Sequence, residues 1–149
     1  MNKLIICDKN KLLIDKLKEQ NLKSNIFEII LLNDDVLNAK LKYINAKICT
    51  ASNPLFNAGG GLDKLLKNTY PNEWKQAKEF NVTDNLFFII SVDNNINSNR
   101  EIIRKCFDGL YLNKNNDFIL TGIGTAIGGL DIEVFIEELK YFMEFNNGK

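Results

Sequence analysis

Ala58-Gly59-Gly60-Gly61-Leu62-Asp63 is the first of two glycine-rich stretches that decide the predicted fold, and Gly122-Ile123-Gly124-Thr125-Ala126-Ile127-Gly128-Gly129 is the second. Each follows an apolar run that indicates a strand and leads towards a segment with helical spacing. Glycine lets the main chain approach an anion and point N–H groups at it, and a helix N-terminus adds positive partial charge. Two such loops in an alternating strand–helix pattern predict two backbone cradles facing one elongated, phosphate-bearing ligand.

The size and charge of the chain narrow its class. Its 149 residues predict one domain over residues 1–149, with 45% hydrophobic and 26% charged residues as in ordinary globular proteins. Lysine plus arginine count 19, and so do aspartate plus glutamate, so the chain lacks the excess of positive charge expected of a nucleic-acid binder. No apolar stretch reaches about 18 residues and no signal peptide is evident. We therefore expect a cytoplasmic protein with neither a nucleic-acid nor a membrane partner.

The three cysteines, Cys7, Cys49 and Cys106, all lie in apolar runs. An odd number in such settings favours reduced core thiols over a disulfide framework, and zinc-ligand spacing is missing. The prediction is no metal site and no cofactor.

Apolar strands alternate with amphipathic helices along the chain. Strands are expected over Lys3–Cys7, Ile26–Leu32, Ala46–Thr50, Leu86–Val92 and Asp117–Thr121. Helices are expected over Asn10–Gln20, from Leu62, over Asn72–Phe80, after a Ser98–Glu101 capping box, and after a cap at Asp131. Continuously apolar strands need a sheet covered on both faces, so the class is α/β, with three layers and about five or six strands.

Two common nucleotide-binding motifs are excluded by the loops. The spacing Gly122-x-Gly124-x-x-x-Gly128 is one residue longer than the dinucleotide fingerprint, and no Lys-Ser or Lys-Thr of a P-loop follows it. After the first strand, where a Rossmann fold has its glycine loop, the chain has Cys7-Asp8-Lys9-Asn10. Asp8 is either a residue that contacts the ligand or a turn residue at a strand end.

Around the first glycine stretch the chain reads Thr50-Ala51-Ser52-Asn53-Pro54-Leu55-Phe56-Asn57-Ala58-Gly59-Gly60-Gly61-Leu62-Asp63. This segment is similar to the macro-domain signature, an Asn-Ala-Ala-Asn box followed by Gly-Gly-Gly-Val-Asp. The second glycine stretch, with Thr121 before it, resembles the phosphate-binding loop of that family. In macro domains a strand that ends in Gly-Asp-Ile precedes these motifs. A similar segment here is Ile29-Ile30-Leu31-Leu32-Asn33-Asp34-Asp35-Val36. The likeness spans about residues 26–140, and the segment before it resembles a divergent branch with an extra N-terminal β-α unit.

The resemblance implies a macro-domain-like α/β/α sandwich with a mixed central sheet that binds ADP-ribose, a related nucleotide or an ADP-ribosylated protein. It implies that Asp35 accepts a hydrogen bond from the adenine amino group and that Asn53 contacts the distal ribose. In hydrolytic members the residue matching Asp63 positions or activates water. The residues implied to pass close to the ribose and cradle the diphosphate are Gly59, Gly60, Gly61, Gly122, Ile123, Gly124, Thr125, Ala126, Ile127 and Gly128.

The chain departs from the family pattern within these motifs. The departures are Thr50 for the first Asn of the box, Asp34 for the Gly before the adenine Asp, Lys64 for a small residue, Ala126 for a Gly, and Gly128 for an aromatic residue. Losing that aromatic side chain leaves the distal end roomier, so the preferred ligand can differ from plain ADP-ribose.

Three functions remain open at this level. One is an enzyme that removes ADP-ribose, an acetyl group or a phosphate from an ADP-ribose adduct, with Asn53 and Asp63 as catalytic residues. The second is a non-catalytic module that reads or sequesters the nucleotide. The third is a scaffold that kept the fold and uses aromatics such as Trp74, Tyr70 and Phe142 as a partner surface.

Structural alternatives accompany these roles. The Asp63 carboxylate can simply stabilise the positive N-terminal end of a helix. Asn53 can form a turn before Pro54, and Trp74 can pack in the hydrophobic core. For the second loop, the sequence predicts that a bulky residue at Gly124 blocks binding, because its Cβ would enter the phosphate path.

Overall fold

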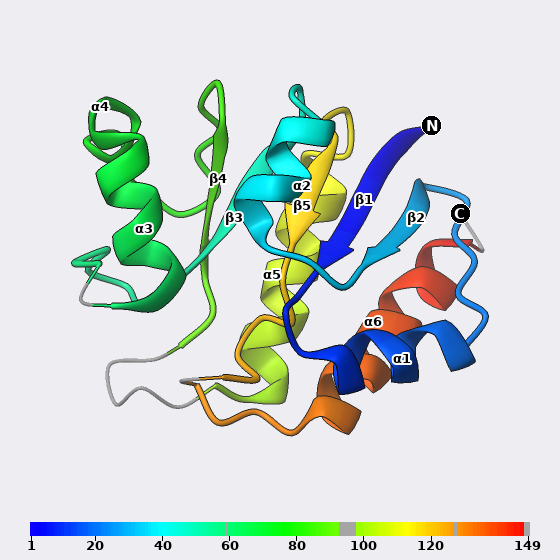
Figure 1. Cartoon of the computed structure of the whole chain (residues 1–149). Helices are drawn as coiled ribbons and strands as arrows, with labels where there is room; N and C mark the ends of the chain where they lie inside the picture. The colour runs from blue at the N-terminus through cyan, green and yellow to red at the C-terminus, as the bar shows by residue number, and fades with distance from the viewer. Residues whose placement is uncertain (59, 93–97, 127, 148–149) are drawn as a thin grey trace.

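A five-stranded sheet with all strands parallel forms the centre of the molecule (Figure 1). The computed structural model describes residues 1–58, 60–92, 98–126 and 128–147. The sheet order is β2-β1-β5-β3-β4. The strands are β1 (Asn2–Cys7), β2 (Phe27–Leu32), β3 (Lys47–Ser52), β4 (Leu86–Ile90) and β5 (Phe118–Leu120).

The expectation of a mixed sheet is wrong, because every pair of named strands runs parallel. Each strand is joined to the next through at least one helix, and such a crossover returns the chain in the same direction. In the described part of the chain, antiparallel pairing is confined to an isolated bridge between Val82 and Phe87.

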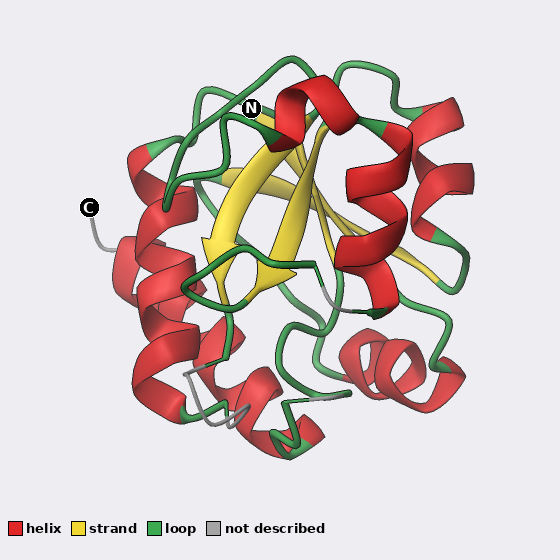
Figure 2. Cartoon of the chain, turned by 90° about the vertical axis from the view of Figure 1, so that its left-hand side faces the viewer, coloured by secondary structure: helices red, strands yellow, loops and turns green. Residues whose placement is uncertain are grey.

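Helices cover both faces of the sheet and give three layers (Figure 2). One hydrophobic cluster joins the sheet to three helices and the other joins it to the remaining three. The first set is α1 (Lys11–Glu19), α5 (Arg100–Leu112) and α6 (Ile132–Asn147). The second set is α2 (Val36–Lys42), α3 (Gly61–Thr69) and α4 (Pro71–Trp74).

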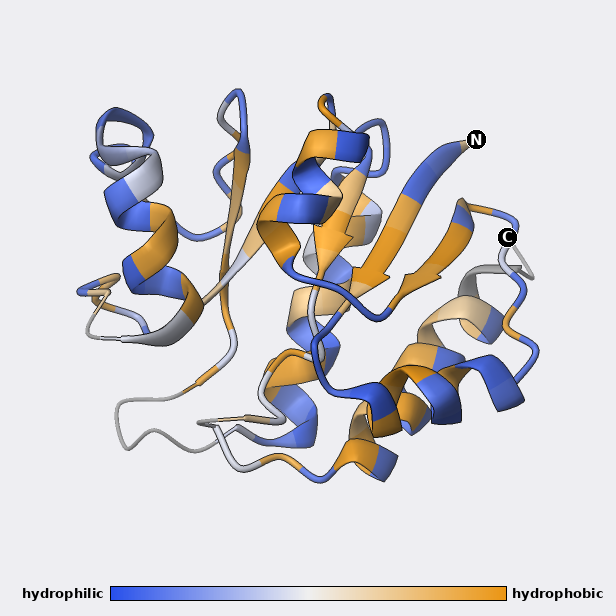
Figure 3. Ribbon diagram, viewed as in Figure 1, coloured by the Kyte–Doolittle hydropathy of each residue, from blue (hydrophilic) through white to orange (hydrophobic). Residues whose placement is uncertain are grey.

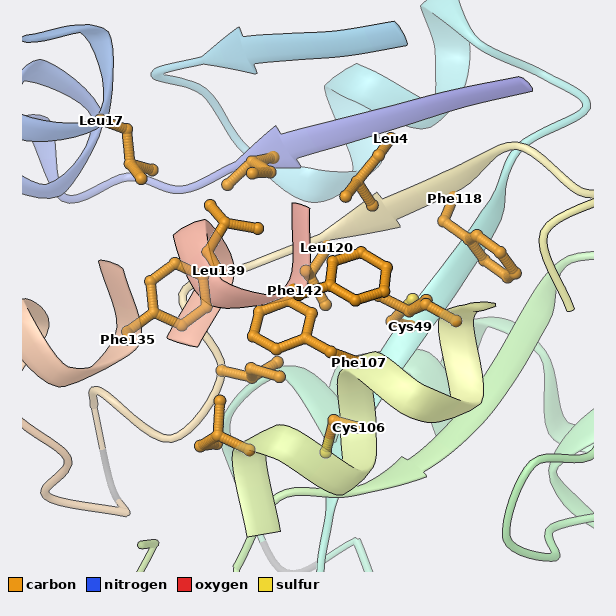
Figure 4. Close-up of a cluster of buried hydrophobic side chains, with 14 of the residues drawn as sticks. Leu4, Leu17, Cys49, Cys106, Phe107, Phe118, Leu120, Phe135, Leu139 and Phe142 are labelled. Carbon is orange, nitrogen blue, oxygen red and sulfur yellow. The ribbon is translucent and has the colours of Figure 1, made fainter. Parts of the chain in front are cut away.

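Successive side chains of a strand point to opposite faces of the sheet and so belong alternately to the two clusters. Leu4 and Ile6 of β1 belong to the cluster beneath α1, α5 and α6, whereas Ile5 and Cys7 belong to the other. Figure 3 shows mostly apolar strands between helices in which apolar and polar residues alternate along the chain. Stacked and tilted phenylalanines from β5, α5 and α6 fill the larger cluster (Figure 4).

Two expected helix boundaries are wrong. The helix expected over Asn72–Phe80 ends at Trp74, because the Glu73 carboxylate accepts hydrogen bonds from the Asn85 backbone N–H (2.7 Å) and side-chain amide (2.9 Å) and turns the chain back. The Phe80 N–H then donates to the Phe88 carbonyl of β4. At α5 the cap is Asn99, whose side chain accepts from the Ile102 N–H. Asp131 accepts from the Glu133 N–H, as expected of a cap.

Several core assignments are confirmed. Cys7, Cys49 and Cys106 are free and buried. Trp74 is 6% exposed and donates from its indole N–H to the Phe56 carbonyl, and Phe142 is 4% exposed. These two aromatics therefore cannot form the partner surface that the scaffold hypothesis requires. Within the described segments, none of the helices is long and apolar enough to cross a membrane.

Candidate functional site

Two adjoining cavities lie where the strands of the sheet end. The larger, of about 370 Å³, is lined by residues that follow β1 and β2 and by the first two turns of α3. The smaller, of about 230 Å³, is lined by the start of α3, the residues after β4 and the loop after β5. Their shared lining residues are Asp8, Gly61, Leu62 and Thr121. We call the two cavities together the cleft.

Both glycine stretches reach the cleft. Gly61, from the first stretch, lines both cavities, and Gly122, Ile123, Gly124, Ala126 and Gly128 of the second line the smaller one. They meet because β3 and β5 are parallel neighbours, so the loops that follow them leave the same edge of the sheet.

Two of the expected cradle residues line neither cavity, and two others are not among the described residues. Thr125 lines neither cavity; its hydroxyl donates to the Gly122 carbonyl at 2.6 Å and holds the loop closed. Gly60 lines neither cavity and precedes the first residue of α3. Gly59 and Ile127 lie outside the described residues.

Asp35 lines the larger cavity, but its carboxylate already has partners. One oxygen accepts from the Leu37 N–H at 2.7 Å, which caps α2, and the other lies 3.1 Å from the Lys9 ammonium. The Leu37 amide, with Lys9 assisting, lowers the pKa of Asp35, so the group stays ionised. A ligand amino group would share these oxygens with the helix cap and with Lys9.

Asn53 and Asp63 are not brought to the cleft. The Asn53 side chain donates to the Asn57 side chain at 2.7 Å and accepts from the Leu55 N–H at 3.0 Å. These hydrogen bonds stabilise a local turn. Asp63 is 7% exposed and lines neither cavity.

Asp63 is buried in the first turn of α3, close to the end of β3. Its Oδ1 and the Ser52 Oγ are both buried without a hydrogen-bond partner in the described part of the chain. Burial raises the pKa of Asp63. Such an unsatisfied buried pair costs stability.

The sequence left the role of Asp8 open, and the structure places its side chain in the middle of the cleft. It lines both cavities. Its Oδ1 accepts from the Asn10 N–H at 2.8 Å and its Oδ2 from the Gly122 N–H at 3.0 Å. Its position after a strand that lies beside β5 could have been found only from the strand order.

The glycines of the second loop are explained by protein packing. A Cβ at Gly124 would lie 2.6 Å from the Ser98 Oγ and 3.1 Å from the Ile103 Cδ1, and one at Gly128 would lie 2.1 Å from the Ser98 Oγ. A Cβ at Gly124 would therefore collide with Ser98 and Ile103, so packing alone explains the glycine. Ser98 is not the helix cap; it donates from its hydroxyl to the Ser91 carbonyl and from its N–H to the Gly128 carbonyl.

The first loop is strained. Phe56 and Ala58 both have positive φ angles, 49° and 52°, which residues with side chains adopt at a cost of about 1–3 kcal/mol each. Strain of this kind persists where the surrounding structure fixes it, commonly at binding sites.

Acidic side chains dominate the charge around the cleft. Asp8, Asp34 and Asp35 line the larger cavity with Lys9, whereas Asp8 alone among the described lining residues charges the smaller one. Burial raises the pKa of the Cys7 thiol to about 11, so this lining residue is not a thiolate at neutral pH. The described residues contain no cluster of three His, Cys, Asp or Glu side chains suited to a metal ion.

Comparison of the chain with protein-family models, with curated proteins and with solved structures found no match.

Gly124 and Gly60 provide a test of the packing of the second loop. Gly124→Ala should lower the free energy of unfolding by about 1–3 kcal/mol, because its Cβ would collide with Ser98 and its φ of 78° is left-handed. Gly60→Ala should change it by less than about 0.5 kcal/mol, since a Cβ there meets nothing within 4 Å. Urea unfolding measures both; equal losses would contradict the packing described.

Asp63 should make stability depend on pH. Because its pKa is higher in the folded than in the unfolded chain, the folded state binds the proton more tightly, and stability falls as pH rises above the ordinary value of 3.8 through the folded value. Asp63→Asn should remove this fall and give a higher urea midpoint at pH 7. The control is Asp15→Asn on the exposed side of α1. A midpoint at pH 7 below that of the parent chain would refute the destabilising role of Asp63.

Proposed function

We propose that this chain is a macro-domain-like module that binds ADP-ribose or a related nucleotide in the cleft. One observation carries the proposal: Gly61 from the first glycine stretch and Gly122, Gly124 and Gly128 from the second line the same cavity. Asp35, the expected acceptor for a base, lines the adjoining cavity.

The dimensions and polarity of the cleft support an elongated ligand. The larger cavity alone falls within the roughly 300–1,000 Å³ of small-molecule sites. In the proposed orientation the base and its ribose occupy the larger cavity and the diphosphate the smaller. Gly61 and Leu62, in the first turn of α3, line both cavities, and no described side chain makes a capping hydrogen bond to that helix. The N-terminal end of its dipole then faces the ligand's negative charge.

The placement of Asn53 and Asp63 favours a binding module over a hydrolase. Neither residue lines the cleft, and a group that activates water must come within hydrogen-bond reach of the reacting atoms. We therefore assign the chain the function of reading or sequestering the nucleotide, either free or as the ADP-ribose group of a modified protein.

Calorimetric titration with ADP-ribose tests the proposal. Ala126 is exposed and lines the smaller cavity, so Ala126→Trp should fill the phosphate end and weaken binding by about tenfold or more, equivalent to about 1.4 kcal/mol. Leu55→Trp is the matched control, because Leu55 is 78% exposed in the first loop and lines neither cavity. Its affinity should match that of the parent chain.

Two results would contradict the proposal. Absence of heat with the parent chain at high micromolar ADP-ribose would remove the binding function. Release of ADP-ribose from a mono-ADP-ribosylated protein, abolished by Asp63→Asn in a chain that still binds, would restore the hydrolase with Asp63 as its water-positioning residue.

A further inference from the structure

The Asp8 carboxylate already occupies an amide that an anionic ligand would use. Its Oδ2 accepts from the Gly122 N–H at 3.0 Å, at the start of the second glycine loop. The Gly122 carbonyl is held by the Thr125 hydroxyl at 2.6 Å and by the Thr125 N–H at 3.1 Å, which fixes the position of this loop turn. The first donor of the proposed phosphate cradle thus has an anion bound to it from within the chain.

The carboxylate and a phosphate would compete at this point on two counts. A backbone N–H bound to a carboxylate makes a charge-assisted hydrogen bond, which the ligand must replace. The two negative charges also repel each other strongly in a partly desolvated cleft. Among the described residues that line the smaller cavity, no lysine or arginine offsets this charge.

We propose that Asp8 is an internal competitor for the phosphate end of the cleft and sets the charge of the ligand that the cleft accepts. The inference rests on the proposed function. A ligand phosphate that accepts from the Gly122 N–H must move the Asp8 carboxylate away from it. A terminal phosphate, which gains a second negative charge near neutral pH, is disfavoured more than an internal diphosphate whose two ends are both esterified. The cleft thereby selects diphosphate diesters such as ADP-ribose over nucleotides with a free terminal phosphate such as ADP.

Asp34 offers a matched carboxylate for comparison. It lines the larger cavity and, like Asp8, accepts a backbone N–H, from Asp35 at 2.7 Å, with a second bond from the Asn38 side chain at 3.1 Å. It lines only the larger cavity, and its hydrogen bonds lie within its own segment. Neutralising it removes the same charge from the cleft without freeing Gly122.

The experiment compares the affinities of ADP-ribose and ADP for the parent chain, Asp8→Asn and Asp34→Asn by calorimetry. Asp8→Asn should bind ADP about tenfold or more tightly than the parent chain and gain less for ADP-ribose, so that the preference for the diester shrinks. Asp34→Asn should raise the affinity for ADP by less than Asp8→Asn does, because it removes one negative charge from the cleft but leaves the Gly122 N–H bound to Asp8. Urea unfolding checks that each variant is folded.

A second measurement keeps the test open if Asp8→Asn does not fold. In the parent chain titrated with ADP-ribose, the amide resonances of Asn10 and Gly122 should shift in step, because one carboxylate holds both N–H groups. Asn10 lines neither cavity, so its shift reports on Asp8 and not on ligand contact. An unmoved Asn10 amide beside a shifting Gly122 amide would overturn the competitor role.

Failure of the inference can be told from failure of the proposed function. If the parent chain binds ADP-ribose and Asp8→Asn gains no more than Asp34→Asn, the competitor is refuted and the binding function stands. If the parent chain binds neither nucleotide but Asp8→Asn binds ADP, the competitor stands and the proposed function of the natural chain falls. If no chain binds either nucleotide, both are overturned.

Discussion

The parallel pairing of β3 with β5 is the constraint on which the site depends. Lys47 and Ile48 of β3 align with Phe118 and Ile119 of β5, and β1 pairs with the other side of β5. Three neighbouring strands therefore end together, and the segments that follow them bring Asp8, the start of α3 and the second glycine loop to one cleft. The apolar clusters on both faces hold this register, because slipping a strand by one residue would turn its buried side chains to the wrong face.

Sequence periodicity located the elements well because the strands are continuously apolar and the helices are amphipathic. Strand direction was not predictable from the motifs, and the resemblance suggested a mixed sheet where every named strand pair is parallel. The end of the short helix at Pro71 depends on hydrogen bonds between Glu73 and Asn85, which lie twelve positions apart along the chain. The Ser98 hydroxyl donates to the Ser91 carbonyl and does not cap α5, whose cap is Asn99. Local patterns contain no information about such contacts.

The candidate site was predictable in outline and not in the roles of single residues. Glycine spacing and the order of strands predicted that both loops face one ligand, and residues of both loops line the smaller cavity. The directions of Asn53 and Asp63 were not predictable, because turn geometry sends one to Asn57 and helix phase buries the other. Asp8 emerged only once β1 was known to lie beside β5. A glycine in a loop can allow either a ligand or another part of the protein to come close, and at Gly124 it makes room for Ser98.

The central claim is that a single nucleotide diphosphate bridges the two glycine loops. A crystal structure of the chain grown with ADP-ribose tests it most directly. We expect diphosphate density between the first turn of α3 and the loop after β5, within hydrogen-bond distance of backbone N–H groups from both. Density for the nucleotide that contacts one loop alone, or that lies away from the cleft, would contradict it.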